Sequence, residues 1–292
     1  MRPSVRPLPL SRPQEPDPVA AFTVDVEDWY QSCVDFDAPI TQRVVRNVHT
    51  ILDLLAETGT KGTFFVQGRV AETFPHVVGT LVAEGHEVQS HGYSHRPLHR
   101  MSPSELRDEL ERARATVEDA AGTPVTAFRA QDFSIVASNL WALDVLAEVG
   151  FEIDSSIFPM RTRRYGISGW ELAPHAVGTP GGHRIVEVPV AVWETPRLRV
   201  PVAGGGYFRL LPKSLLERAL RSVAEERPPV VYCHPYEFSS TELDDYRGRV
   251  SRRLLFSQGA GREAFPGRVR ALLETLRFGR FDAVLRGWGV PA

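Results

Sequence analysis

The feature that most constrains the fold of this chain is a repeated alternation between short β-rich runs and longer helical patterns. Strands separated by helices of about 10–20 residues are typical of parallel sheets covered by helices, so the sequence predicts an α/β protein. The predicted strands are residues 22–26, 62–66, 86–90, 125–129, 151–154 and 230–234, with further candidates at 184–190 and 198–202 in a turn-rich stretch. The predicted helices are residues 41–57, 69–84 with an interruption at Pro75, a segment beginning at Ser102, 138–149, 213–226 and a last one at about 263–276.

Capping signals support two of these helices. Ser102, Pro103 and Glu105 have the spacing of an N-cap, a first helical residue and a capping-box acid. Gly59 follows the 41–57 pattern, where a C-terminal cap is expected.

No linker-like change of composition divides residues 21–292, and the sequence therefore predicts a single domain. A barrel of parallel strands fits this length. An open doubly wound sheet is the alternative, but no glycine-rich phosphate loop follows any predicted strand.

Composition and charge exclude several classes of function. The 292 residues contain 34 Lys and Arg against 36 Asp and Glu, which provides no basic field for nucleic acid, and no apolar run approaches the ~18 residues of a membrane span. Residues 1–20 are rich in Pro and Arg and lack the ~7-residue apolar core of a secretion signal. They predict a disordered leader and a cytoplasmic protein, in which Cys33 and Cys233 are free thiols.

Ionisable residues cluster where the predicted strands end. The carboxyl ends of parallel strands form the active face of such folds. Two imidazoles four residues apart, with one upstream carboxylate, make a three-ligand site with open positions for water, as in a catalytic metal centre, and a second acid there can serve as base. The ionisable residues at the ends of the predicted strands are Asp25, Glu27 and Asp28, His91 and His95, Arg129, Asp154 and His234.

Five short motifs follow one another in a recognisable order. They are Thr23-Val-Asp-Val-Glu-Asp28, His91-Gly-Tyr-Ser-His95, Phe128-Arg-Ala130, Asp154-Ser-Ser-Ile-Phe-Pro159 and Tyr232-Cys-His-Pro-Tyr-Glu237. Together they resemble the motifs of the polysaccharide deacetylases of carbohydrate esterase family 4, the NodB homology domain. Residues 24–29, 201–212 and 246–281 resemble more narrowly the subfamily found with exosortase-linked exopolysaccharide loci, whose C-terminal block covers about 236–281 here.

The resemblance implies an irregular (β/α)7 barrel that removes N-acetyl groups from an amino-sugar polysaccharide or its lipid-linked precursor, with a divalent ion, zinc as first choice. It implies Asp25 as base and His234 as acid, with Asp154 as the carboxylate beside His234 and Arg129 holding it in place. His91 and His95 would bind the ion. For the third ligand Asp28 is preferred, because the strand alternation is expected to end before Trp29, and Glu27 is the alternative.

Other assignments complete the expected site. Gly205 in the Gly204-Gly-Gly206 loop, Tyr207 and Trp29 are candidates for contact with a sugar. Gln131-Asp132 departs from the subfamily pattern and places an additional carboxylate near Arg129. The alternatives are a catalytically weakened carbohydrate-binding relative, a hydrolase of another C–N amide bond on the same fold, and an Fe(II) oxygenase with a two-histidine, one-carboxylate triad. Sequence does not indicate an oligomeric state.

Overall fold

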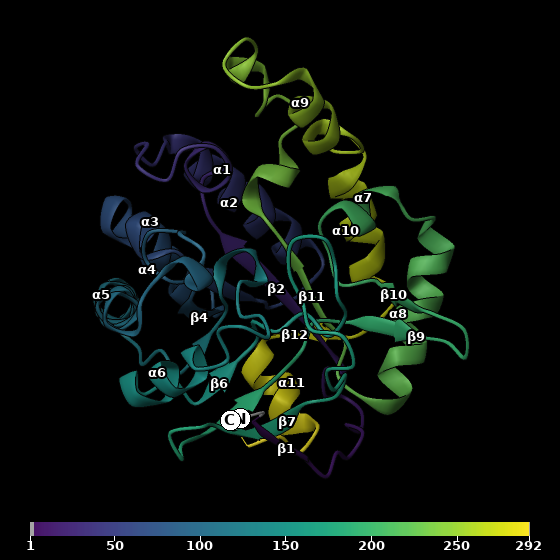
Figure 1. Cartoon of the computed structure of the whole chain (residues 1–292). Coiled ribbons are helices and arrows are strands. Elements are labelled where there is room, and N and C mark those ends of the chain that lie inside the picture. The colour runs from purple at the N-terminus through teal and green to yellow at the C-terminus, as the bar shows by residue number, and fades with distance from the viewer. Residues whose placement is uncertain (1–2, 292) are drawn as a thin grey trace.

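The computed structural model describes residues 3–291 and is built around one large mixed sheet (Figure 1). Its strand order is β1-β7-β8-β6-β5-β4-β3-β2-β11, with β12 also paired to β2. Apart from the two-residue β12, which runs parallel to β2, seven strands have a parallel neighbour, as in the expected barrel: β2 (Ala20–Val26), β3 (Thr63–Val66), β4 (Glu87–Ser90), β5 (Ala127–Phe128), β6 (Ile153–Asp154), β8 (Arg184–Glu187) and β11 (Val230–Cys233). The α/β prediction is confirmed.

The barrel is irregular because β8 and β11, the outermost parallel strands, do not pair directly. The segment between β8 and α7 lies along β11 instead. The Ala191 N–H donates to the Val230 carbonyl over 2.9 Å, and the Tyr232 N–H donates to the Ala203 carbonyl over 2.8 Å. Gly204 approaches β11 so closely that a Cβ there would meet the Tyr232 carbonyl oxygen at 1.9 Å, which explains the need for glycine.

Helices cover the outside of the sheet and bury one apolar face each. In α2, for example, Val44, Val48, Ile51 and Leu55 are buried at helical spacing. The helices that match sequence predictions are α2 (Gln42–Glu57), α3 (Gly68–Thr73) and α4 (Pro75–Ala83), which divide the 69–84 pattern at Pro75, α5 (Pro103–Ala121), α6 (Ala142–Val149), α8 (Lys213–Glu226) and α10 (Phe265–Leu273). The capping box of Ser102 and Glu105 is present as predicted.

Several short elements were not predicted, because each is too short to show a hydrophobic period. They are α1 (Trp29–Cys33), β7 (His175–Gly178), β9 (Val192–Glu194), α7 (Gly206–Leu210), α9 (Arg252–Gly259), β12 (Phe278–Gly279) and α11 (Phe281–Gly287). The strand candidate at 198–202 becomes β10 (Arg199–Pro201), which forms a separate hairpin with β9. The last helix is α11 rather than the predicted 263–276 segment.

The N-terminal segment is ordered in the described part of the chain, which corrects the expectation of a disordered leader. β1 (Ser4–Pro7) pairs antiparallel with β7, and Leu8 and Leu10 pack against the core. The Ser11 N–H donates to the Trp288 carbonyl. The unpaired N–H and C=O groups at the edge of a sheet can pair with an extended segment whatever its side chains are, and β1 pairs in this way with the edge strand β7. Residues 1–2 of the predicted leader lie outside the described residues.

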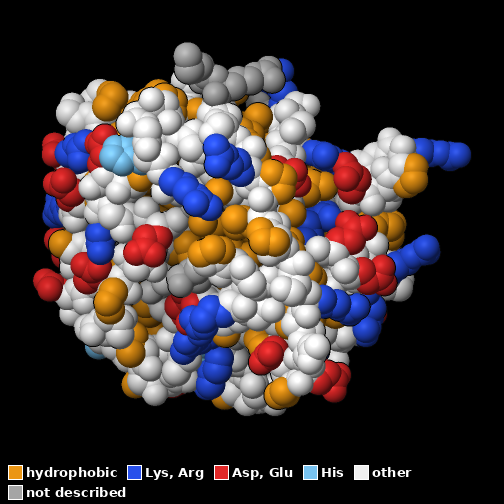
Figure 2. All heavy atoms as spheres, turned by 90° about the horizontal axis from the view of Figure 1, so that it is seen from below, with side chains coloured by type: hydrophobic (Ala, Val, Ile, Leu, Met, Phe, Trp, Pro, Cys, Tyr) orange, Lys and Arg blue, Asp and Glu red, His pale blue; other side chains and the backbone are white. Residues whose placement is uncertain are grey.

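The surface agrees with the near-neutral charge. Figure 2 shows basic and acidic side chains interspersed over the face that it presents, without a field of one sign. Within residues 3–291, no helix has the length and apolar character needed to cross a membrane. Cys33 and Cys233 are both free.

Candidate active site

A pocket of about 320 Å³ opens where the parallel strands end. Its lining includes Asp25 and Glu27 from the end of β2, His91 and His95 from the loop after β4, and His234 from the end of β11. These five side chains come from the ends of three strands, β4, β2 and β11. β2 and β11 are neighbours in the sheet, and β3 lies between β4 and β2. The structure therefore brings together the central residues that the sequence predicted.

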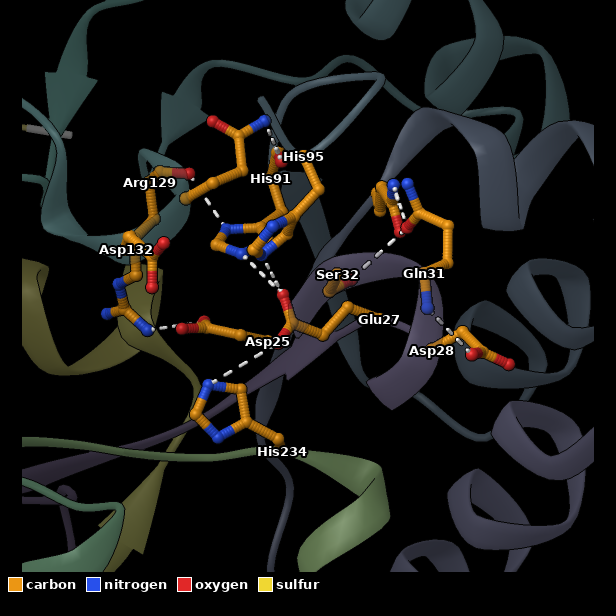
Figure 3. Close-up of polar contacts among 12 residues, drawn as sticks. Asp25, Glu27, Asp28, Gln31, Ser32, His91, His95, Arg129, Asp132 and His234 are labelled. Carbon is orange, nitrogen blue, oxygen red and sulfur yellow. Dashed lines mark hydrogen bonds and ion pairs between the residues drawn. The ribbon is translucent and has the colours of Figure 1, made fainter. Parts of the chain in front are cut away.

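Glu27, His91 and His95 form a compact three-residue cluster inside this pocket (Figure 3). One ligand atom from each lies within 4.8 Å of the others, and all three side chains are buried. His91 Nε2 lies 3.3 Å from Glu27 Oε2, and His95 Nε2 is in closer contact with the same oxygen. Because the His91 Nδ1 atom lies 2.8 Å from the Arg129 carbonyl, which can only accept, Nδ1 carries the proton and Nε2 offers its lone pair to the cluster.

The local backbone explains how a loop brings both imidazoles together. Gly92 and His95 have φ values of 69° and 66°, so the chain turns sharply between the two histidines. The amide of Gln131 passes over Gly92 and donates to the His91 carbonyl over 2.8 Å. A Cβ on Gly92 would meet Gln131 Nε2 at 1.7 Å, and a glycine is therefore required there.

The electrostatics of the cluster fit a divalent cation. Burial alone would raise the pKa of Glu27, but the charge of His95 and the hydrogen bonds of both imidazoles hold that pKa well below its usual value. His95 Nδ1 is a buried atom with no hydrogen-bond partner among the described residues. One carboxylate and two imidazoles are a donor set that suits zinc and leaves positions open.

Asp28 does not belong to this cluster, which corrects the preferred ligand assignment. It is the N-cap of α1, where one of its oxygens accepts from the Tyr30 and Gln31 N–H groups over 3.1 and 3.3 Å. The other oxygen accepts from the Thr41 N–H over 2.9 Å and from the Thr41 hydroxyl. The alternation of the strand continues through Glu27, so Glu27 shares a side with Asp25 while Asp28 points to the helix.

Asp25 lies beside the cluster and is held by Arg129. The guanidinium donates from Nη1 to Asp25 Oδ1 over 2.8 Å and to the Thr23 hydroxyl over 2.7 Å, and from Nη2 to the Ser155 hydroxyl over 3.1 Å. Arg129 is itself fully buried and lies over the Phe65 ring at 4.2 Å. The arginine thus orients Asp25, not Asp154 as the resemblance implied.

His234 faces Glu27 from the other side of the pocket, with its Nε2 3.8 Å from Glu27 Oε1. Its Nδ1 lies 3.1 Å from Glu237 Oε2, and the second Glu237 oxygen lies 3.3 Å from Arg209 Nε. Burial would lower the pKa of His234, but the Glu237 hydrogen bond and the charges of Glu27 and Glu237 outweigh it and raise this pKa to about 9. The Tyr236 ring stacks on the imidazole at 4.8 Å. These contacts favour the protonated form of the imidazole.

Asp154 does not reach His234, which corrects its expected role. It is fully buried on β6, accepts from the Ser156 hydroxyl, and faces Glu187 across the β6–β8 pair. Burial raises the pKa of Asp154 to about 6. Burial and the Asp154 charge raise the pKa of Glu187 well above its usual value, which favours the protonated form of that carboxyl.

The expected sugar contacts are only partly in place. Gly205 lines the pocket and precedes helix α7, which opens at Gly206 although no helix was expected there. Trp29 is fully buried against Tyr246, so its ring is not available to a sugar. Tyr207 is partly exposed and lies outside the pocket lining, whereas Tyr165 is part of that lining.

Asp132 also lies at the pocket, with a φ of 55°. Its carboxylate pairs with the exposed Arg164, with both oxygens 3.2 Å from Nη2. The additional carboxylate expected near Arg129 is therefore engaged by a different arginine.

Sequence reasoning missed Glu237, Arg209 and Glu187. Glu237 had a readable signal, because His234-Pro-Tyr-Glu237 has the spacing of a capping box, and the structure contains that box. Arg209 and Glu187 had none, since their partners come from distant segments.

The chain matches two known family models, which together cover most of its length. Residues 14–151 match the family model described as "Polysaccharide deacetylase", and residues 155–286 match "Domain of unknown function (DUF3473)". The chain is 29% identical to a chitooligosaccharide deacetylase from Bradyrhizobium sp. over 48% of this chain and 57% of that protein. It is 28% identical to a peptidoglycan-N-acetylglucosamine deacetylase from Bacillus cereus over 56% of this chain and 61% of that protein.

The chain thus spans less than two thirds of the length of these curated relatives. Among solved structures, it is similar to a Mycobacterium smegmatis protein described as a polysaccharide deacetylase. The TM-score is 0.58 at 23% identity, with 93% of this chain and 91% of the other covered. This likeness supports the fold.

Proposed function

Residues 14–151 place this chain in the polysaccharide deacetylase family, and from that premise we propose that the protein hydrolyses N-acetyl groups on an amino-sugar polysaccharide or its lipid-linked precursor. The observation that carries the proposal is the geometry of one pocket. Glu27, His91 and His95 form a cation site, with Asp25 beside it and the His234 imidazole facing it.

Glu27, His91 and His95 would hold the divalent ion. Such an ion polarises an amide carbonyl and lowers the pKa of a bound water, from 15.7 to about 7 in favourable sites. The hydrogen bond between His91 and the Arg129 carbonyl keeps that imidazole in the tautomer that a ligand needs.

Asp25 accepts the proton of the attacking water in this proposal. Its Oδ1 is occupied by the Arg129 guanidinium, which fixes the carboxylate and leaves Oδ2 for the water. A positioned general base contributes typically ~10²–10⁴-fold to the rate.

His234 donates a proton to the departing amine. An amine leaves poorly unless it is protonated, and the Glu237 carboxylate keeps His234 charged at neutral pH. Because Glu237 occupies Nδ1, the proton available to the substrate is the one on Nε2, the atom that faces Glu27.

The complete donor set favours an enzyme over a weakened carbohydrate-binding relative. The residues that the proposed reaction uses line one pocket, and the unusual Asp132 is paired with Arg164 rather than placed among the proposed ligands. An exopolysaccharide is the substrate class that the C-terminal resemblance suggests, and zinc is the first choice of metal.

The test is acetate release from N-acetylated oligosaccharides, including chitooligosaccharides, with and without a chelator. Turnover that the chelator abolishes and zinc restores supports the proposal. One equivalent of bound zinc without acetate release from any N-acetylated sugar would favour the carbohydrate-binding alternative.

The role of His234 has its own test. His234→Ala is expected to lower the turnover of acetamides far more than that of activated aryl acetates, because a phenolate leaves without a proton. Equal losses on both substrates would assign His234 to substrate positioning.

A further inference from the structure

Exposed apolar side chains occur on two helices whose other residues line the catalytic pocket. Among residues 3–291, six large hydrophobic side chains are exposed, and three of them belong to α7 and α9. These are Phe256 at 80% exposure, Leu210 at 67% and Tyr207 at 38%. The two helices are joined by a hydrogen bond from the Arg209 guanidinium to the Gln258 carbonyl.

The outer surface of α9 is also basic. Residues 246–262 contain five arginines and no acidic residue. Arg249, Arg252 and Arg253 are exposed, and no acidic side chain within the described residues lies at ion-pair distance from any of them, whereas Arg247 pairs with Asp244. Phe256 lies one helical turn from Arg252 and Arg253, so apolar and cationic groups occupy the same outward face.

α9 has no fully buried residue, but its inner side contacts the fold. Leu254 and Leu255 pack against a cluster that includes Trp29 and Tyr246. The buried Arg262 donates to the Gln258 carbonyl over 2.7 Å and to the Tyr236 carbonyl over 2.7 Å. Figure 1 shows α9 projecting beyond the other elements on the side of the molecule toward which β2 and β11 point.

This face adjoins the catalytic pocket. Leu254 and Gln258 of α9 line that pocket on their inner side. On the outer side, Leu255, Phe256 and Arg252 line a separate cavity of about 780 Å³. If a partner covered the outer face of α9, the catalytic pocket would therefore lie close to the surface of that partner.

We propose that the α9 rim, defined by Arg252, Arg253, Phe256 and Leu210, docks on the surface of an anionic phospholipid bilayer. Helices that lie in a membrane interface combine a cationic face with Phe or Leu side chains that enter the headgroup region, and α9 has both. The rim offers too few apolar side chains for a stable protein interface, which uses roughly 20–30 residues a side. The inference rests on the proposed function in one respect: docking would present sugars on a membrane-bound carrier to the pocket.

The experiment is co-sedimentation of the full chain with vesicles of phosphatidylcholine alone and of phosphatidylcholine with phosphatidylglycerol. Binding is expected only with the anionic lipid and is expected to weaken with salt. Arg252→Ala combined with Arg253→Ala should weaken binding roughly 30-fold, and Phe256→Ser roughly tenfold. The matched control is Leu198→Ser with Arg197→Ala in the β9–β10 hairpin, an exposed hydrophobic and arginine pair away from the rim, which should change nothing.

The proposal is overturned if the unmodified protein does not bind anionic vesicles at low salt, if it binds neutral vesicles equally, or if the rim variants bind as well as the hairpin control. Self-association that Phe256→Ser abolishes, without vesicle binding, would instead assign the rim to a second copy of the chain. Acetate release from a soluble oligosaccharide is measured in parallel. The rim variants should retain it, so failure of docking and failure of the deacetylase proposal give different results.

Discussion

Glu27 and Asp28 are adjacent carboxylates in different surroundings, and substitutions should separate the roles that we propose for them. Glu27 faces His91 and His95 from within the buried cluster, whereas Asp28 caps α1 and binds Thr41. Glu27→Gln is therefore expected to remove zinc while leaving the helix cap intact. Asp28→Ala is expected to retain zinc and to destabilise the fold.

The magnitudes follow from the contacts. Asp28 accepts from three backbone N–H groups and one hydroxyl. Loss of an N-cap costs about 0.5–2 kcal/mol, and a buried donor left without a partner adds about 1–3 kcal/mol, which suggests about 2–4 kcal/mol for Asp28→Ala. For 292 residues, with an unfolding entropy of about 2.1 cal/mol/K per residue, that corresponds to a fall in Tm of roughly 3–7 °C. Loss of a direct ligand should weaken zinc binding by more than the ~10–100-fold of an outer-shell change.

The two variants are compared by their zinc content after dialysis, their zinc affinity in a titration and their thermal unfolding. His91→Ala is the positive control for metal loss. Full zinc content in Glu27→Gln would refute the ligand assignment. So would a folded Asp28→Ala protein that cannot bind zinc, since the sequence-based choice of Asp28 would then be correct.

Three further predictions concern the remaining carboxylates of the pocket and its surroundings. Asp25→Asn should keep stoichiometric zinc and lower kcat by ~10²–10⁴-fold, measured by acetate release; unchanged kcat would exclude the base role. Glu237→Gln should move the alkaline limb of kcat/KM to lower pH, because it removes the leading cause of the raised His234 pKa, whereas Asp154→Asn should not move it. Glu187→Gln should flatten the pH dependence of unfolding. The raised pKa of Glu187 means that the native state holds an extra proton and that stability falls as pH rises above about 4.5, as denaturant titrations at several pH values would show.

Local patterns in the sequence were sufficient for the architecture and for most of the site. Strand and helix periods are properties of neighbouring residues, so the parallel strands and the capping box of Ser102 could be predicted from the chain alone. The predicted strands also indicated which ionisable residues follow a strand end. Asp25, His91 and His95 were predicted at one end of the sheet, and in the structure they line one pocket there.

The residues that sequence placed wrongly are those whose partners are far away along the chain. The N-terminal strand β1 required knowledge of an open edge at β7, and a fully buried Trp29 required the packing of Tyr246. Neither partner is visible in a local pattern. Both depend on how the C-terminal half folds against the first strands.

Tertiary structure also decided the two assignments on which the chemistry depends. β2 ends at Val26 as predicted, but the backbone is still extended at Asp28. Because successive side chains of an extended chain point to opposite sides, Glu27 faces the imidazoles and Asp28 does not. His234 takes Glu237 as its carboxylate because the short helix after β11 turns that side chain back, while the pairing of β6 with β8 directs Asp154 toward Glu187. Sequence determined which groups reach this end of the barrel, and the packing and register between elements determined which of them touch.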